Sequence, residues 1–230
     1  IYAAFGTGDP LYGFSVPNAR SPIAFITGGG SLNTINRNPD GSCTFFYTGA
    51  SESSKFFCFD LMADNIPGRP FLKTRRSDGT ITFNSLQPPL NIMTSIQAPN
   101  QGPLFQGLNV SPYVGGFGTE VSGLLTGNGS YRYQVDIPVP GGFEIAAHLP
   151  WSRGGVVLVT ISDSFRYSHG VTEGAYGRTG GVSFVFNAAG GTPYEPAIPY
   201  QVRTNYTGIP YDRRPVALLI ATAGLPFPYN

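Results

Sequence analysis

The sequence predicts an all-β protein made of two β-sandwich-like units, with mostly antiparallel strands and long loops rich in glycine and proline. The chain of 230 residues contains 31 glycines and 21 prolines, and both residue types interrupt helix interiors. Short apolar or alternating runs are separated by clusters of Gly, Pro, Asn and Asp, which is the pattern of strands joined by turns. Apolar residues make up 41% of the chain, which is enough to build a hydrophobic core.

The first half contains seven expected strands and two expected hairpin turns. We expect the turns at 38–41 (NPDG) and 77–79 (SDG), because glycine supplies the positive φ that a tight turn needs and aspartate tolerates it. The expected strands are 11–16, 23–26, 43–48, 55–61, 71–76, 80–84 and 91–96.

The second half contains five more expected strands, at 131–138, 143–149, 155–162, 181–187 and 215–223. The run GVVLVTIS at 155–162 is apolar almost throughout, which indicates burial on both faces, and we expect 181–187 to be its partner. A helix is the alternative for 215–223, but β-branched residues and a flanking proline favour a strand. Residues 99–129 are rich in glycine and carry one charge, so we expect a linker or surface arm between domains 1–98 and 130–230.

Charged residues form only 12% of the chain, and the formal net charge is +1. This balance gives no sign of the basic patch that a nucleic-acid-binding protein needs. A surface so poor in charge predicts that neighbouring chains cover part of it. The absence of a long apolar run predicts no membrane insertion, and the opening residues do not read as a signal peptide. Cys43 and Cys58 are expected to be buried thiols, or a disulfide if their segments pair.

No pattern in the sequence indicates a catalytic centre. The G-x-S-x-G elbow, a phosphate loop with its lysine and a calcium loop are all missing. Asp60 with Asp64, and Asp136 with Glu144, are candidate carboxylate pairs for glycoside hydrolysis, but spacing does not place two acids in one groove, and we expect these acids to be solvated at strand ends and turns. Asp163 and His169 lack an activated serine. We therefore expect no enzyme, no catalytic residues, no cofactor and no metal.

Two segments rich in aromatic residues are candidate binding surfaces. Residues 163–180 are expected to form a long loop that either packs against another subunit or binds a ligand, because rings give contact area at small entropic cost. Residues 193–214, with regularly spaced tyrosines and prolines, are expected to form an extended strap or a ligand platform. The candidate binding residues are Trp151, Phe165, Arg166, Tyr167, His169, Tyr176 and Arg178.

Several segments of the first hundred residues carry a resemblance. They are LYGFSV at 11–16, GRPFLKT at 68–74, RSDGTITFNS at 76–85 and PLNI at 89–92. Together they resemble a family of small tail-tip proteins of tailed bacteriophages, which open with a YG-[LF]-x-V strand and carry an S-D-G hairpin followed by a P-L-x-[IV] strand. The chain departs from the family where an Asp-x-x-Gly turn usually follows the first strand, since PNAR stands at 17–20.

The resemblance implies a virion structural protein at the distal tail, in the tail tip or baseplate region, assembled in the host cytoplasm. Its expected partners are copies of itself, a trimer being one arrangement, other virion proteins, and a glycan or receptor on the host surface. A carbohydrate- or receptor-binding adhesin is one alternative, with Trp151, Tyr167 and Tyr176 as stacking platforms. A capsid or decoration subunit with a jelly roll is another, and a glycan-degrading enzyme is a third.

Overall fold

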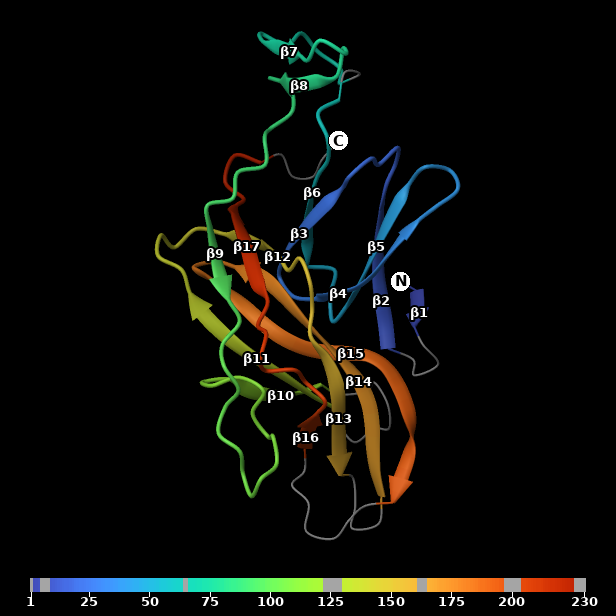
Figure 1. The fold of residues 1–230 in the computed structure, drawn as a ribbon, viewed down its shortest axis with the longest axis vertical. Helices are drawn as coiled ribbons and strands as arrows, with labels where there is room; N and C mark the ends of the chain where they lie inside the picture. Colours follow the sequence, from blue (N-terminus) through green and yellow to red (C-terminus); the bar gives the residue numbers. More distant parts are fainter. Residues whose placement is uncertain are drawn as a thin grey trace.

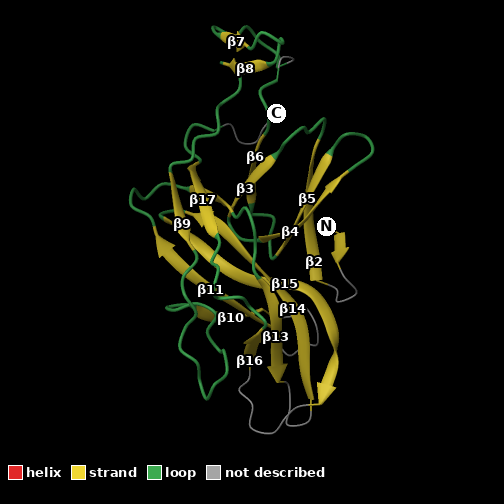
Figure 2. Cartoon of the chain, in the orientation of Figure 1, coloured by secondary structure: helices red, strands yellow, loops and turns green. Residues whose placement is uncertain are grey.

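The computed structural model of the chain describes residues 2–4, 9–63, 66–121, 130–160, 165–196 and 204–225. None of these residues is helical, so the all-β class that the sequence predicts is confirmed (Figure 2). The described residues accordingly hold no helix with the length and hydrophobicity that crossing a membrane requires. The strands form three sheets of four, eleven and two strands (Figure 1).

The four-stranded sheet is antiparallel, in the order β1-β2-β5-β4. The expected turn at 38–41 joins its last two strands: Gly41 has a φ of 81°, and the Asp40 carboxylate accepts a hydrogen bond from the Ser42 amide at 2.9 Å. Strand β4 was not predicted, because its sequence is mostly polar; pairing with β5 holds it in the sheet. The four strands are β1 (Tyr2–Ala4), β2 (Asp9–Val16), β4 (Ser31–Arg37) and β5 (Cys43–Thr48).

The eleven-stranded sheet has the main order β10-β11-β15-β14-β3-β12-β17-β9. Strand β13 pairs with β14 and β16, and β6 pairs with β3. Its strands are β3 (Ile23–Thr27), β6 (Lys55–Phe59), β9 (Thr94–Gln97), β10 (Phe117–Val121), β11 (Ser130–Pro138), β12 (Ile145–His148), β13 (Gly154–Thr160), β14 (Phe165–Arg178), β15 (Gly181–Pro196), β16 (Thr204–Thr207) and β17 (Val216–Ala221).

The expected loop at 163–180 is wrong, because residues 165–178 form β14, one of the longest strands. Its glycines are sites of close approach rather than loop residues: a Cβ atom at Gly177 would collide with the carbonyl group of Ile145, and one at Gly174 would collide with Ser31. The expected pairing of 155–162 with 181–187 is also wrong, since β13 pairs with β14 and β16 rather than with β15. Residues 193–214 likewise contain the end of β15 and all of β16, so the expected strap is partly sheet.

Strands from both sides of the expected linker share the large sheet. Strand β3 pairs with β12 and β14, and β9 pairs with β17. Strand β10 itself falls inside 99–129. The expected division into 1–98 and 130–230 therefore does not separate two sheets, because composition reports a glycine-rich stretch and not which distant strands pair. The strand expected at 215–223 is present as β17.

Strands β14 and β15 have hydrophobic cores on both faces. On one face, Ala175 and Phe184 join the main core with Val135 of β11 and Leu219 of β17. On the opposite face, Tyr176 and Val185 pack in a second core with aromatic residues of the four-stranded sheet, including Phe45 and Tyr47. A third cluster lies between β3, β6, β12 and β17. The β14–β15 hairpin thus contributes side chains to both the main core and the second core.

The two-stranded sheet stands apart from the other sheets, at the top of Figure 1. It consists of β7 (Lys73–Arg75) and β8 (Ile81–Asn84). The expected turn at 77–79 joins them, with a φ of 85° at Gly79 and a 2.9 Å hydrogen bond from the Thr80 amide to the Asp78 carboxylate. We call residues 61–93, which leave the body after β6 and return to it at β9, the arm.

The two cysteines are both free. Cys43 on β5 is buried, as expected, whereas Cys58 on β6 is exposed, so the prediction of two buried thiols is wrong for Cys58. The alternative of a disulfide is also wrong, because both thiols are free and the two strands do not pair with each other.

Candidate functional site

The candidate binding residues of the sequence do not gather on one surface. Trp151 lies between β12 and β13 and is 44% exposed. Phe165, Arg166 and Tyr167 begin β14, where their backbones pair with β15; their side chains lie outside the described part of the structure. The expected pairing of Asp163 with His169 cannot be placed, because residue 163 also lies outside it.

His169, Tyr176 and Arg178 occupy three different environments on β14. His169 is buried opposite the core residue Val157 of β13, and burial lowers the pKa of its ring to about 4. Tyr176 is buried, and the Arg132 guanidinium lies over its ring at 5.5 Å. It therefore offers no open face on which a sugar can stack. Arg178 is half-buried beside Asp136.

The candidate acid pairs are engaged in separate contacts. Asp136 accepts a 2.6 Å hydrogen bond from Ser183, whereas Glu144 forms an ion pair of 2.8 Å with Lys55. The Asp60 carboxylate accepts hydrogen bonds from two backbone amides of the segment before β3, and its expected partner Asp64 lies outside the described residues. No group of three His, Cys, Asp or Glu side chains in the described ranges could hold a metal ion.

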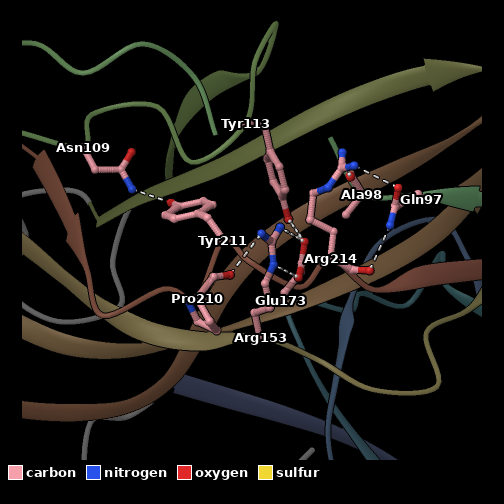
Figure 3. A network of polar contacts seen from close by, with 9 residues as sticks. All are labelled: Gln97, Ala98, Asn109, Tyr113, Arg153, Glu173, Pro210, Tyr211 and Arg214. Atoms are coloured by element: carbon pink, nitrogen blue, oxygen red, sulfur yellow. Dashed lines mark hydrogen bonds and ion pairs between the residues drawn. The ribbon is translucent and has the colours of Figure 1, made fainter. Parts of the chain in front are cut away.

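A buried ion pair lies on the core face of β14 (Figure 3). The Glu173 carboxylate accepts hydrogen bonds from Arg153 Nε at 2.7 Å and from Arg153 Nη2 and the Tyr113 hydroxyl at 2.8 Å each. Both charged side chains are fully shielded from solvent. The guanidinium carbon lies over the ring of Phe186, 5.8 Å from its centroid, and over the ring of Tyr211, 5.4 Å from its centroid.

This network joins segments that are far apart in the chain. Arg153 also donates to the Pro210 carbonyl at 3.4 Å, and the Tyr211 hydroxyl accepts from Asn109 (Figure 3). Burial, together with the Glu173 charge, raises the pKa of Tyr113 well above its usual value. Burial lowers the pKa of Arg153, but the Glu173 carboxylate outweighs this and holds it above its usual value. The ion pair at the centre of the network is fully shielded from solvent, and the network ties β13 and β14 to the segments at 113 and 210–211.

The arm presents a concentration of exposed apolar side chains. Phe71, next to the β7–β8 hairpin, is 87% exposed, and Leu72 beside it is 49% exposed. Exposed large apolar side chains on a protruding segment are characteristic of a surface that another molecule covers. The exposed apolar residues of the arm are Leu61, Phe71, Leu72, Leu90, Ile92 and Met93.

The apolar tip of the arm is flanked by positive charge. The segment GRPFLKTRRSDGT at 68–80 has four basic residues, Arg69, Lys73, Arg75 and Arg76, and one acid, Asp78. The pKa of Asp78 is held below its usual value by hydrogen bonds from Thr80, so the acid belongs to the turn. The tip therefore presents an apolar centre with basic residues beside it in the sequence.

Comparisons with known proteins add no assignment. No family model matches the chain, and neither a curated protein nor a solved structure matches it.

Sequence reasoning missed both main features. No pattern in the sequence marks Arg153 or Glu173. The correct pairing of β13 with β14 would have revealed the ion pair. Gly154 and Thr172 are register partners, and Arg153 and Glu173 are the next residues opposite each other. For the arm, the signal was an adjacent Phe71 and Leu72 inside a charged segment, which is unusual in a strand that must bury one face.

Proposed function

We propose that this chain is a structural subunit that joins neighbouring protein subunits through its arm. The observation that carries the proposal is the exposed apolar tip, with Phe71 at 87% exposure on a two-stranded sheet set apart from the others. An isolated two-stranded hairpin gains little stability by itself. We therefore expect burial against a partner to stabilise this hairpin.

The finer proposal is a place at the distal tail of a tailed bacteriophage virion, in the tail tip or baseplate region. The residues that resemble the tail-tip family form β2 and much of the arm, including the β7–β8 hairpin. The resemblance and the exposed apolar tip thus fall on the same segment. Copies of this chain and other virion proteins are the proposed partners.

The edges of the large sheet support an assembly role as well. In the described residues, β9 pairs only with β17 and β10 only with β11, so each leaves one side without a neighbouring strand. Such edges can accept a strand from another chain. Low charge across the sequence fits the same proposal, because charges are depleted in the centre of protein interfaces.

The test is the oligomeric state of the purified chain, measured by size-exclusion chromatography with light scattering. We expect an oligomer for the natural sequence and dissociation for Phe71→Ser. Burying a phenylalanine contributes about 1.5–3 kcal/mol, so each contact should weaken roughly 10- to 100-fold. Ile35→Ser is the matched control, because Ile35 is 46% exposed on β4, away from the arm. A natural chain that stays monomeric at high concentration, or equal effects of the two substitutions, would contradict the proposal.

A second candidate, a carbohydrate- or receptor-binding adhesin, rests on the exposure of Trp151. An exposed indole ring is a suitable stacking surface for a sugar or a receptor side chain. Loss of binding to host polysaccharide in Trp151→Ala, with an unchanged unfolding midpoint, would favour this function. Unchanged binding would remove its main support.

A further inference from the structure

Polar side chains tie the segment that leaves the body to the segment that returns to it. Gln87 Oε1 accepts a hydrogen bond from the Ala63 amide at 2.8 Å, and Gln87 Nε2 donates to the Asp60 carbonyl at 3.2 Å. Asn84, which is fully buried, donates from Nδ2 to the Ala63 carbonyl at 2.8 Å. Asn84 Oδ1 accepts from the Leu86 amide at 3.1 Å. The arm is therefore braced by its own side chains.

Ser85 connects the returning segment to Phe71 and Leu72, which we call the apolar pair. The Ser85 hydroxyl oxygen accepts hydrogen bonds from the Phe71 amide at 3.0 Å and from the Leu72 amide at 3.3 Å. The Ser85 amide donates to the Leu72 carbonyl at 3.0 Å. Pro70 precedes the pair, and its ring fixes its own φ. These restraints limit the backbone conformation of the apolar pair, and so the direction in which its two side chains leave the backbone.

The apolar pair combines a restrained backbone with exposed side chains. Both of its amides are hydrogen-bonded inside the arm, whereas both of its side chains are exposed. The exposure is therefore not that of an unstructured loop. A partner that binds such a segment loses less free energy to ordering it, because the segment is already ordered before association.

We propose that Ser85 is a positioning residue, which holds Phe71 and Leu72 in the conformation that a neighbouring subunit binds. The role of Ser85 rests on the proposed assembly function of the arm, and it means that the arm docks in a conformation present before association. Without the Ser85 hydroxyl, two adjacent amides lose their shared acceptor, and the segment samples other conformations. The apparent affinity then falls by the fraction of chains that still hold the binding conformation.

The dissociation constant of the oligomer, measured by light scattering over a dilution series, tests this role. Ser85→Ala should weaken association about three- to tenfold, the effect of losing one ordering restraint. Ser85→Thr keeps the hydroxyl group and should associate like the natural chain. Thr82→Ala is the matched control, because it removes the 2.8 Å hydrogen bond between the Thr74 and Thr82 hydroxyls of the same hairpin and leaves the contacts of Ser85 in place.

Amide hydrogen exchange separates positioning from a direct contact between Ser85 and the partner. In the dissociated chain, followed by NMR, the Phe71 and Leu72 amides should exchange about tenfold faster in Ser85→Ala than in the natural chain, since their acceptor is gone. Thr82→Ala should leave this exchange unchanged. The thermal unfolding midpoint should match that of the natural chain in every variant, because the β7–β8 sheet is separate from the larger sheets.

The outcomes distinguish the role of Ser85 from the assembly role of the arm. An oligomer that Phe71→Ser dissociates but Ser85→Ala leaves unchanged would overturn the role of Ser85 and leave the proposed function standing. Equal effects of Ser85→Ala and Thr82→Ala on association, unchanged exchange at Phe71 and Leu72, or a lowered unfolding midpoint in Ser85→Ala would overturn it too. A natural chain that stays monomeric would overturn the proposed function, and the docking role of Ser85 with it.

Discussion

Glu173→Gln is the substitution that tests the buried network most sharply. It keeps the volume of the side chain, so it creates no cavity. It removes the negative charge opposite Arg153 and replaces one acceptor oxygen by an NH2 group, which then faces the donors of Arg153 or Tyr113. The guanidinium then stays fully buried without a counter-ion, and at least one of the three short hydrogen bonds to the carboxylate is lost. Breaking a buried pair in this way costs about 3–5 kcal/mol.

Urea unfolding, followed by the fluorescence of Trp151, measures this loss. Trp151 is the one tryptophan of the chain and stands two residues before Arg153. Glu144→Gln is the matched control, because its ion pair with Lys55 has the same 2.8 Å distance but side chains that are 32% and 39% exposed. Exposed pairs contribute about 0–1 kcal/mol, so the control should change little.

A second substitution separates charge burial from other causes. Adding Arg153→Met to Glu173→Gln removes the stranded cation and should recover part of the lost stability, since apolar replacement of a buried pair is often neutral. A loss below about 1 kcal/mol for Glu173→Gln, a loss equal to that of the control, or no recovery in the double variant would refute this reasoning.

Three further predictions concern burial, close packing and exposure. Lowering the pH from 7.5 to 5.5 should destabilise the protein, because burial depresses the pKa of His169 to about 4 in the folded state while the unfolded chain gains the proton near pH 6.5; urea midpoints should fall in the natural chain and fall less in His169→Gln. Gly177→Ala should cost about 1–3 kcal/mol through overpacking against Ile145, whereas Gly154→Ala should cost less in the same assay, because its nearest neighbour is 3.7 Å away. Phe71→Ser should leave the unfolding midpoint of the dissociated chain within a degree or two, about the scale expected for an exposed site; a large shift would show that Phe71 supports the fold rather than an interface.

The strands that could be predicted from sequence are those whose signal is local. The apolar runs of β13 and β17 indicate buried strands by themselves. The glycines at 41 and 79 indicate turns by themselves, because each supplies the positive φ that its turn needs. Strand β14 escaped prediction because its glycines resemble loop residues. Gly174 and Gly177 are required by Ser31 and Ile145, which are remote in sequence.

One pairing error explains why the buried network was missed. If β13 paired with residues 181–187, as the sequence predicts, nothing would bring Arg153 and Glu173 together. With β13 paired to β14, the Glu173 amide donates to the Arg153 carbonyl at 2.8 Å, and their side chains fall together.

Limited trypsin digestion tests the central claim, that another subunit covers the arm. Three of the four basic residues at its tip, Lys73, Arg75 and Arg76, are trypsin cleavage sites on the segment that carries the exposed Phe71. The fourth, Arg69, is followed by Pro70 and is not cut by trypsin. Mass spectrometry of the fragments should show rapid cleavage at the three sites in the dissociated chain and strong protection in the oligomer or particle that contains it. Equal cleavage of the arm in both states would contradict the account.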